Sequence, residues 1–177
     1  MALDRIDFDI LAALQNDGRL TNKELAGRVG LAPSSCLERV RRLREAGALR
    51  GSHAEVDPAV LGIGLQALLA VRLRQHSRDV VDAFRRYVRT VPEVTAVYHV
   101  TGAQDFLVHV AVRDSNHLRD MALDAFTTRP EVAHIETSLI FDYARVPRLP
   151  DYHLPRQPPK KVRRARPAPS GRGRGRG

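Results

Sequence analysis

The sequence predicts an α+β protein with two folded domains, the first helical and the second built on a β-sheet. Three observations support this fold class. Apolar residues recur at helical spacing up to residue 47, Leu- and Val-rich runs typical of strands begin at residue 65, and a stretch containing Pro and Gly separates the two patterns. We therefore expect residues 1–57 to form the first domain, residues 58–64 to form a hinge, and residues 65–150 to form the second domain.

The first predicted helix runs from residue 4 to about residue 16. Asp4 can cap its N-terminus, and the Asp17-Gly18 pair suits its end. The residues with mostly helical spacing are Leu3, Ile6, Asp7, Ile10, Leu11 and Leu14.

Two shorter helices follow and are joined by a tight turn. Thr21 and Glu24 have the spacing of a capping box, in which the hydroxyl accepts from the backbone N–H of Glu24 and the carboxylate accepts from that of Thr21. Gly30 can end this helix in a left-handed conformation. Pro33 suits the first position of the next helix, because the N–H that it lacks would be unpaired there. This arrangement predicts a helix-turn-helix over residues 21–47.

The third helix is expected to pack through Leu37, Val40 and Leu43, which leaves a surface rich in arginine and hydroxyl residues. A helix with one apolar stripe and a basic remainder can enter the major groove of DNA. Residues 48–57, which contain a Gly51-Ser52 turn signal, are predicted as a short β segment or wing that contacts the DNA backbone. The first domain is therefore predicted to be a winged helix-turn-helix.

Candidate DNA-binding residues lie at the start of the second helix and along the third. Ser34 and Ser35 can contact a phosphate or a base. The alternative is that they simply cap the N-terminus of the helix. For Arg39 the candidates are a base edge, a phosphate, or Glu38 and its neighbours, and we favour DNA. The full set is Thr21, Asn22, Ser34, Ser35, Glu38, Arg39, Arg41 and Arg42.

The second domain is predicted as strand, helix, strand, strand, helix, strand. Ser77 and Ser115 are expected to cap the helices, which end before Pro92 and Pro130, and a short link at Gly102 joins the second and third strands. This βαββαβ order is the ferredoxin-like arrangement, with two helices on one face of the sheet. The uncovered face carries apolar residues and is expected to pair with a second copy of the chain. The expected strands are residues 65–75, 93–102, 105–114 and 132–145.

The net charge of +9 is unevenly distributed along the chain. Residues 1–57 contain nine basic and nine acidic residues, and residues 58–150 contain eleven and ten. Residues 151–177 contain nine Lys or Arg and one Asp, so DNA binding by the folded part must depend on the local placement of charge. This last segment, rich in Pro, Gly and Arg, is predicted to be a disordered basic tail. Two interpretations of it stay open, an arm that neutralises phosphates and a solvated extension.

Several classes of function lack residues to support them. The single cysteine, Cys36, excludes an intramolecular disulfide and indicates a reducing compartment, and we expect a packed small residue there and not a redox switch. The N-terminus does not resemble a signal peptide, and no apolar stretch is long enough to span a membrane. No metal-site spacing, cofactor motif or catalytic motif is present. We therefore expect a cytoplasmic protein that is not an enzyme and has no metal, cofactor or membrane partner.

Taken together, these residues resemble the Lrp/AsnC family of transcription regulators, also called feast/famine regulatory proteins. The resemblance covers residues 3 to about 146. It departs from the family pattern at Ala32, where a capping Ser is usual. The motifs that carry it are, in order, the Asp4/Asp7 helix, Asp17-Gly18-Arg19, Glu24-Leu25-Ala26, Arg39-Val40-Arg41-Arg42-Leu43, Asp57-Pro58 and Gly102-Ala103-Gln104-Asp105.

The resemblance implies a dimer whose C-terminal sheets pair and whose ligand, usually an amino acid, binds in clefts between subunits. Backbone N–H groups around Gly102 could then approach a carboxylate, and Asp105 could hold an ammonium or order the loop. The alternatives are that Gly102 is only a hairpin residue with positive φ and that Asp105 is only an acceptor in the turn. Thr137 and Ser138 could likewise be ordinary strand residues. The candidate effector-binding residues are Thr101, Gly102, Asp105, Thr137 and Ser138.

The leading hypothesis is a sequence-specific DNA-binding transcription regulator that responds to an amino acid or related small molecule. Its expected partners are double-stranded DNA, the effector, and a second copy of the chain, with assembly to tetramers or octamers left open. The expected location is the cytoplasm, in association with the nucleoid. The alternative is an architectural DNA-compacting protein with little sequence or ligand specificity.

Overall fold

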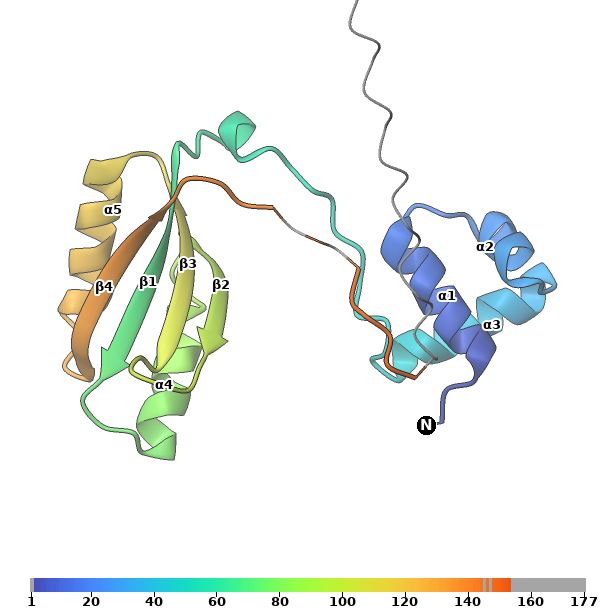
Figure 1. The fold of residues 1–177 in the computed structure, drawn as a ribbon, viewed down its shortest axis with the longest axis horizontal. Helices are drawn as coiled ribbons and strands as arrows, with labels where there is room; N and C mark the ends of the chain where they lie inside the picture. Colours follow the sequence, from blue (N-terminus) through green and yellow to red (C-terminus); the bar gives the residue numbers. More distant parts are fainter. Residues whose placement is uncertain (1, 145, 147, 154–177) are drawn as a thin grey trace, which may run out of the picture.

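The computed structural model describes residues 2–144, 146 and 148–153. Two folded bodies are connected by an extended passage of chain (Figure 1). Three helices form the N-terminal body, and a four-stranded sheet with its helices forms the C-terminal body. The predicted tail lies outside the described residues from residue 154 onward.

Local capping determines where the three N-terminal helices begin. Asp4 and Thr21 each form a capping box with the residue three positions later, as the sequence predicts for Thr21. Gly30 ends the second helix with φ 69°, in the left-handed region. Ala32 gives the third helix no side-chain cap, and Pro33 is its first residue. The helices are α1 (Arg5–Asn16), α2 (Asn22–Val29) and α3 (Pro33–Glu45).

The core of this body lies where the three helices meet. Cys36, Val40 and Leu43 of α3 are buried, whereas Leu37 is 59% exposed, so the predicted stripe is wrong at Leu37. Residues at i, i+4 and i+7 stay on one side of a helix, whereas steps of three drift by about 60° each, and Cys36 therefore takes the core position. Burial raises the pKa of the Cys36 thiol. The other buried residues of this core are Asp7, Ile10, Leu25 and Ala26.

Residues 48–57 form no strand within the described chain, so the predicted β segment is not formed. A β segment needs a neighbouring strand to pair its backbone groups, and no described strand lies against this one. All side chains of residues 50–57 are exposed. The expected hinge contains one short 3₁₀ helix, Pro58–Leu61, capped by the side chain of Asp57.

The C-terminal body has the predicted βαββαβ order, and its strands are antiparallel in the spatial order β2-β3-β1-β4. Asp114, and not the predicted Ser115, caps α5, because its side chain accepts from the backbone N–H of His117 at 2.9 Å. A single π-helical turn, η2, extends α5. The elements are β1 (Leu65–Leu73), α4 (Arg78–Val88), β2 (Val94–His99), β3 (Phe106–Val112), α5 (Ser115–Ala122), η2 (Leu123–Thr127) and β4 (Val132–Ile140).

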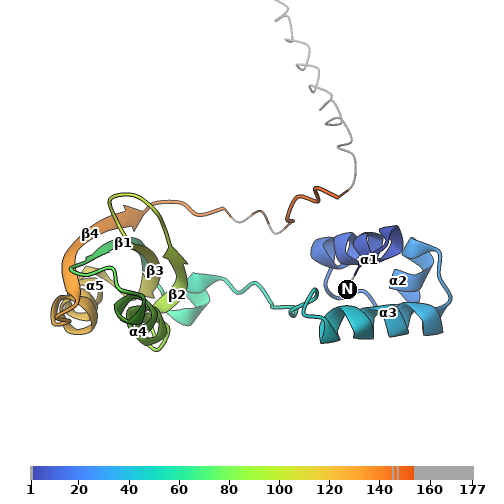
Figure 2. The ribbon, with the colours of Figure 1, turned by 90° about the horizontal axis from the view of Figure 1, so that it is seen from below.

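One face of the sheet is covered and the other is open. Both α4 and α5 lie on the same side of the sheet (Figure 2). Strand residues that point to this side, such as Leu69 and Val108, are fully buried against Phe84 and Phe126. We call the alternate residues, which point away from the helices, the open face. Among the described helices, none has both the length and the apolar character that crossing a bilayer demands.

Candidate functional site

The outward surface of α3 carries a network of charged side chains. Arg41 donates from Nη2 to Oε1 of Glu38 at 2.6 Å and from Nη1 to Oε1 of Glu45 at 2.8 Å. The hydrogen-bonded Arg41 guanidinium lowers the pKa of Glu38 below its ordinary value. Exposed donors and acceptors on one helix can hydrogen-bond to base edges in a major groove.

The first turns of α3 are exposed as well. The backbone N–H groups of Ser34 and Ser35 have no partner within the helix, because they lie in its first turn, and Ala32 supplies no cap. Such a helix start can meet a phosphate. Leu37 is the exposed apolar residue beside them, and an apolar side chain in this position can contact the methyl group of thymine. A helical wheel that places Cys36, Val40 and Leu43 on one side of α3 leaves Leu37 on the surface, so the exposure of Leu37 could have been predicted from the sequence.

Arg39, in contrast, is bonded within the domain. Its Nη1 donates to Oδ2 of Asp4 at 2.7 Å and to Oδ1 of Asp7 at 2.8 Å. Arg42 also reaches Asp7, with Nη2 3.0 Å from Oδ2. The side chain of Asp7 is fully buried, so both arginines satisfy a carboxylate that water does not reach. The pKa of Asp4 is lowered, first by the backbone N–H of Asp7 and then by Arg39. These bonds fix α3 on α1.

Thr21 and Asn22 also make contacts inside the motif. The Thr21 hydroxyl donates to Oε2 of Glu24 at 2.8 Å and accepts from the Glu24 backbone N–H at 3.3 Å. Nδ2 of Asn22 donates to the carbonyl oxygen of Pro33 at 2.7 Å, which ties the start of α2 to the start of α3. The candidates that share the exposed surface of α3 are Ser34, Ser35, Glu38 and Arg41, and those bonded within the domain include Thr21, Asn22, Arg39 and Arg42.

Among the candidate effector residues, Asp105 hydrogen-bonds to the backbone at the C-terminal end of β1. Its backbone N–H donates to the carbonyl of Val71 at 2.9 Å, and its Oδ2 accepts from the backbone N–H of Leu73 at 2.7 Å. Its Oδ1 lies 2.9 Å from Nδ1 of His76. In this structure the carboxylate therefore orders the turn, which is one of the roles that the sequence left open.

The other effector candidates do not gather around one point. Thr101 and Gly102 are exposed, and φ of 121° at Gly102 is a conformation that favours glycine. Thr137 pairs with Leu69 on the covered side, whereas Ser138 belongs to the open face, because successive strand residues point to opposite sides. Their partners Leu69 and Leu68 lie four and five residues before Leu73, which at about 3.3 Å per residue is about 13 and about 17 Å along β1 from the contact with Asp105. One subunit alone does not assemble them into a single cleft.

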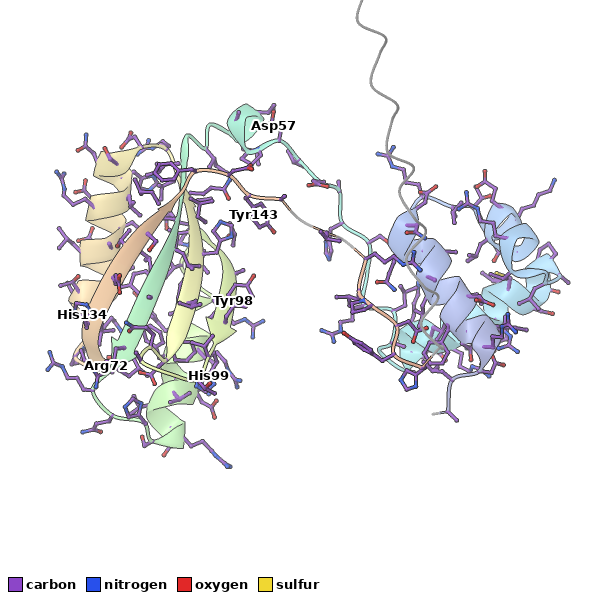
Figure 3. The ribbon with its side chains drawn as sticks, in the orientation of Figure 1. Asp57, Arg72, Tyr98, His99, His134 and Tyr143 are labelled. Atoms are coloured by element: carbon purple, nitrogen blue, oxygen red, sulfur yellow. The ribbon has the colours of Figure 1, made fainter. Side chains whose placement is uncertain are left out.

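A cavity of about 460 Å³ lies on the open face. His109 and Gln66 meet in it, with His109 Nε2 2.9 Å from Gln66 Oε1, and the ring of Tyr143 lies 5.6 Å from the His109 ring. Burial lowers the pKa of His109. Figure 3 shows Tyr98, another lining residue, on the β2 edge and Tyr143 where the chain leaves the sheet. No sequence motif points to this cavity, since its lining residues come from distant segments.

The opposite end of the open face carries Arg72 and His134, which pair across β1 and β4 (Figure 3). Their neighbourhood does not form a metal site. In the part of the chain that the structure describes, no group of three or more His, Cys, Asp or Glu residues is placed to hold a metal ion.

The two bodies match two known domain families. Residues 3–50 match the winged helix-turn-helix DNA-binding family, and residues 66–145 match the Lrp/AsnC ligand binding domain. With the exposed surface of α3, these matches define a DNA-binding transcription regulator that carries a ligand-binding domain and is not an enzyme. The chain belongs to the Lrp/AsnC family. Proteins of this family bind DNA and small-molecule effectors and form oligomers.

Relatives align with most of the chain. It is 45% identical over 143 residues to the HTH-type transcriptional regulator AldR of Mycolicibacterium smegmatis, covering 81% of this chain and 84% of the relative. It is 36% identical over 140 residues to the leucine-responsive regulatory protein of Escherichia coli, covering 79% and 85%. A Neisseria meningitidis transcriptional regulator, solved in complex with L-methionine, superposes with a TM-score of 0.78 at 35% identity, covering 86% and 99%. These relatives give no support to the DNA-compacting alternative.

Proposed function

We propose that the chain binds double-stranded DNA as a homodimer, with α3 of each subunit in a major groove and half-sites about 34 Å apart. The observation that carries this proposal is the division of polar side chains on α3. Glu38 and Arg41 stay exposed, while Arg39 bonds to the buried Asp7 of α1. A helix fixed in this way loses little freedom on binding, which favours affinity. The protein would act in the cytoplasm, at the nucleoid.

The exposed residues of α3 suggest how bases are distinguished. Glu38 can accept from N4 of cytosine, Arg41 can donate to guanine, and Leu37 can contact the methyl group of thymine. Ser35 at the helix start and the outer nitrogen atoms of Arg42 can contact phosphates. In this proposal Arg39 supports the reading surface and does not touch DNA.

The open face of the sheet supports the proposed dimer. An antiparallel sheet face in contact with water is normally polar. Here Leu68 and Leu107 are partly exposed, and no described helix covers them. A second copy of the same face would bury these side chains and complete the core on that side. Assembly of dimers into tetramers or octamers would use other surfaces.

The effector is proposed to be an amino acid. The ligand-binding match and the L-methionine complex of the Neisseria relative support this class of ligand. The exposed turn at Thr101 and Gly102 is the candidate contact for its carboxylate, and Asp105 keeps that turn closed. Because Thr137 and Ser138 face opposite sides of β4, at most one of them would contact the effector from a given subunit.

Selection from random duplexes followed by footprinting tests the DNA proposal. We expect protection of two related half-sites about one helical turn apart. Glu38→Gln and Glu45→Gln form a matched pair, since each residue accepts a bond from Arg41. Only Glu38→Gln should change the preferred base. Protection without a repeated half-site, or equal effects of the two variants, would count against the proposal.

A thermal-shift screen of the twenty amino acids tests the effector proposal, since a ligand selective for the native state raises the melting temperature. We expect a shift with at least one amino acid and its loss in Gly102→Val. Because φ of 121° strains a residue with a side chain, Gly102→Val should also lower the melting temperature without ligand, and the comparison is therefore made on the ligand-induced shift. Comparing Thr137→Val with Ser138→Ala then shows which side of β4 contributes. If none of the twenty shifts the melting temperature, the proposed class of effector is wrong.

A further inference from the structure

A groove of about 450 Å³ lies between α4 and α5 on the outer surface of the C-terminal body. Both helices cover the side of the sheet opposite to the open face (Figure 2). A dimer formed through the open face would therefore leave this groove in contact with solvent. Neither the reading of DNA by α3 nor the proposed effector contact uses the groove.

Contacts between its walls hold the groove in shape. The hydroxyl of Tyr87 on α4 donates to the carbonyl oxygen of Ala125 in η2 at 3.0 Å. The guanidinium of Arg129 lies over the Tyr87 ring, 3.9 Å from its centroid. On α5, Nε2 of His117 lies 3.1 Å from Oε1 of Glu93, which precedes β2. Because the walls are already connected, a partner would not have to open the groove in order to bind.

The groove has an apolar floor and an acidic rim. Val91 and Met121, which line the floor, are only 9% and 6% exposed. Asp120 and Asp124 lie at the rim, are exposed, and are four residues apart. Like charges at this helical spacing repel each other. Asp120 pairs with Arg119 at 2.8 Å, but Asp124 has no ion pair within the described residues, so a cation from outside would relieve this repulsion.

Three exposed arginines with the opposite charge lie next to the groove, at Arg85, Arg86 and Arg89 of α4 and its C-cap. We call them the ridge. Arg85 and Arg89 are again four residues apart and repel each other. Arg85 pairs with Asp82 at 2.9 Å, whereas Arg86 and Arg89 have no ion pair in the part of the chain that the structure describes. Tyr87 lines the groove from the same helix turn, so the ridge and the groove are adjacent.

We propose that the ridge of one copy of the chain enters the groove of a second copy, which makes the same contact in return. A ridge beside a groove of opposite charge is self-complementary, because a two-fold axis between the copies brings each ridge to the other groove. The guanidinium groups would bond to Asp120 and Asp124, while their alkyl stems would cover the apolar floor.

The inference rests on the open-face dimer proposed above and adds a second contact to it. Two different two-fold contacts on each chain generate closed assemblies with an even number of chains, such as tetramers or octamers. The groove would then be the surface that joins one dimer to the next.

Charge reversal tests the contact, measured by sedimentation velocity of the full chain without DNA. The ridge variant is Arg86→Glu with Arg89→Glu, and the groove variant is Asp120→Lys with Asp124→Lys. Each variant alone should need a concentration about 100-fold higher, or more, to assemble beyond the dimer, because like charges then face each other. An equal mixture of the two variants, and a chain with all four changes, should regain assembly because opposite charges face each other again.

A matched control and a second measurement accompany these variants. Arg28→Glu with Arg44→Glu makes the same charge change at exposed positions of the N-terminal body and should leave assembly unaltered. Raising the salt concentration from about 0.05 M to about 0.5 M should shift the unaltered chain toward dimers, since salt screens the proposed ion pairs. Assembly that does not respond to salt would contradict a contact based on charge.

The outcomes separate this inference from the dimer on which it rests. Unchanged assembly in both reversal variants overturns the groove contact and leaves the open-face dimer standing. An effect of the groove variant without one of the ridge variant would show that another basic partner occupies the groove. Leu68→Asp, on the open face, tests the dimer itself. If the reversal variants are monomers while Leu68→Asp remains a dimer, the groove is the dimer contact and the proposed open-face dimer is wrong.

Discussion

Arg39 of α3 and Asp7 of α1 form an ion pair of 2.8 Å in which the carboxylate is fully buried. The residues are 32 positions apart, so the pair connects the first helix of the chain to the helix that we propose enters the DNA groove. Removing one partner of a buried pair leaves the other charge uncompensated, which costs more than replacing both partners with apolar residues. In the proposed complex Arg39 would therefore affect DNA binding through the position of α3.

Substitution of this pair should separate stability from specificity. We expect Asp7→Ala to lower the free energy of unfolding by about 3 kcal/mol, measured by urea denaturation. Arg39→Ala should also destabilise the domain, and it should weaken binding to specific and random duplexes by similar factors. Arg44→Ala, an exposed change on the same helix, is the control and should leave stability nearly unchanged. Native stability of Arg39→Ala with loss of base preference would instead assign Arg39 to direct reading.

The uncapped start of α3 offers a stabilising change. Ala32 has φ −65° and ψ 145°, the extended conformation of an N-cap residue, but no side-chain oxygen. Ala32→Ser should therefore raise the free energy of unfolding by about 1 kcal/mol. Ala46→Ser, the same change at the other end of the helix, should have little effect. A melting temperature that rises equally in both variants would contradict the capping explanation.

Two leucines of α3 should respond in opposite ways. Leu37 is exposed and Leu43 is fully buried. Leu37→Ala should keep the stability within about 0.5 kcal/mol and weaken specific binding more than random binding. Leu43→Ala should cost about 3 kcal/mol, because it leaves a cavity in the core. Denaturation and competition binding on the same preparations measure both effects, and a strongly destabilised Leu37→Ala would place Leu37 in the core after all.

His109 should make stability depend on pH. Burial lowers its pKa below the ordinary 6.5, and the groups that contact its ring are Gln66 and Tyr143. As the pH falls below 6.5, the unfolded chain takes up the proton before the folded one does, so the stabilisation present above 6.5 is lost as the pH falls through the lowered pKa. His109→Gln should flatten the decline in melting temperature between about pH 7.5 and 5.5. An equal decline in the variant would show that other groups cause it.

Asp105 should contribute to the stability of the fold, whether or not the effector is bound. Since its carboxylate accepts from the backbone of Leu73, Asp105→Ala should lower the melting temperature with and without effector. His76→Ala removes only the exposed partner of the same carboxylate and should cost much less. Loss of effector affinity at native stability would place Asp105 in direct contact with the ligand.

Local features of this fold could be predicted from the sequence, because they depend on residues a few positions apart. The capping box at Thr21, the left-handed Gly30 and the βαββαβ order are all of this kind. The pairing of Arg39 with Asp7 could not be predicted, because it depends on how α1 packs on α3.

Contacts in the C-terminal body that depend on tertiary packing could not be predicted from the sequence either. The meeting of Gln66, His109 and Tyr143 depends on strand register and on the path of the chain after β4. The placement of Thr137 and Ser138 on opposite faces of the sheet could have been predicted, since neighbouring residues on a strand point to opposite sides.

The contact of residues 148–153 with α1, through Leu149 on Gln15 and His153 on Phe8, has a mechanical consequence. Residues 50–64 lead from the helical body to the sheet, and the chain after β4 comes back to the same body at Gln15. A domain joined to its neighbour by one linker can rotate freely about that linker. A domain joined by two linkers can rotate only if both linkers change conformation. The second attachment, at Gln15, is therefore expected to restrict rotation of the helical body relative to the sheet, and it lies on α1, the helix on which α3 is fixed.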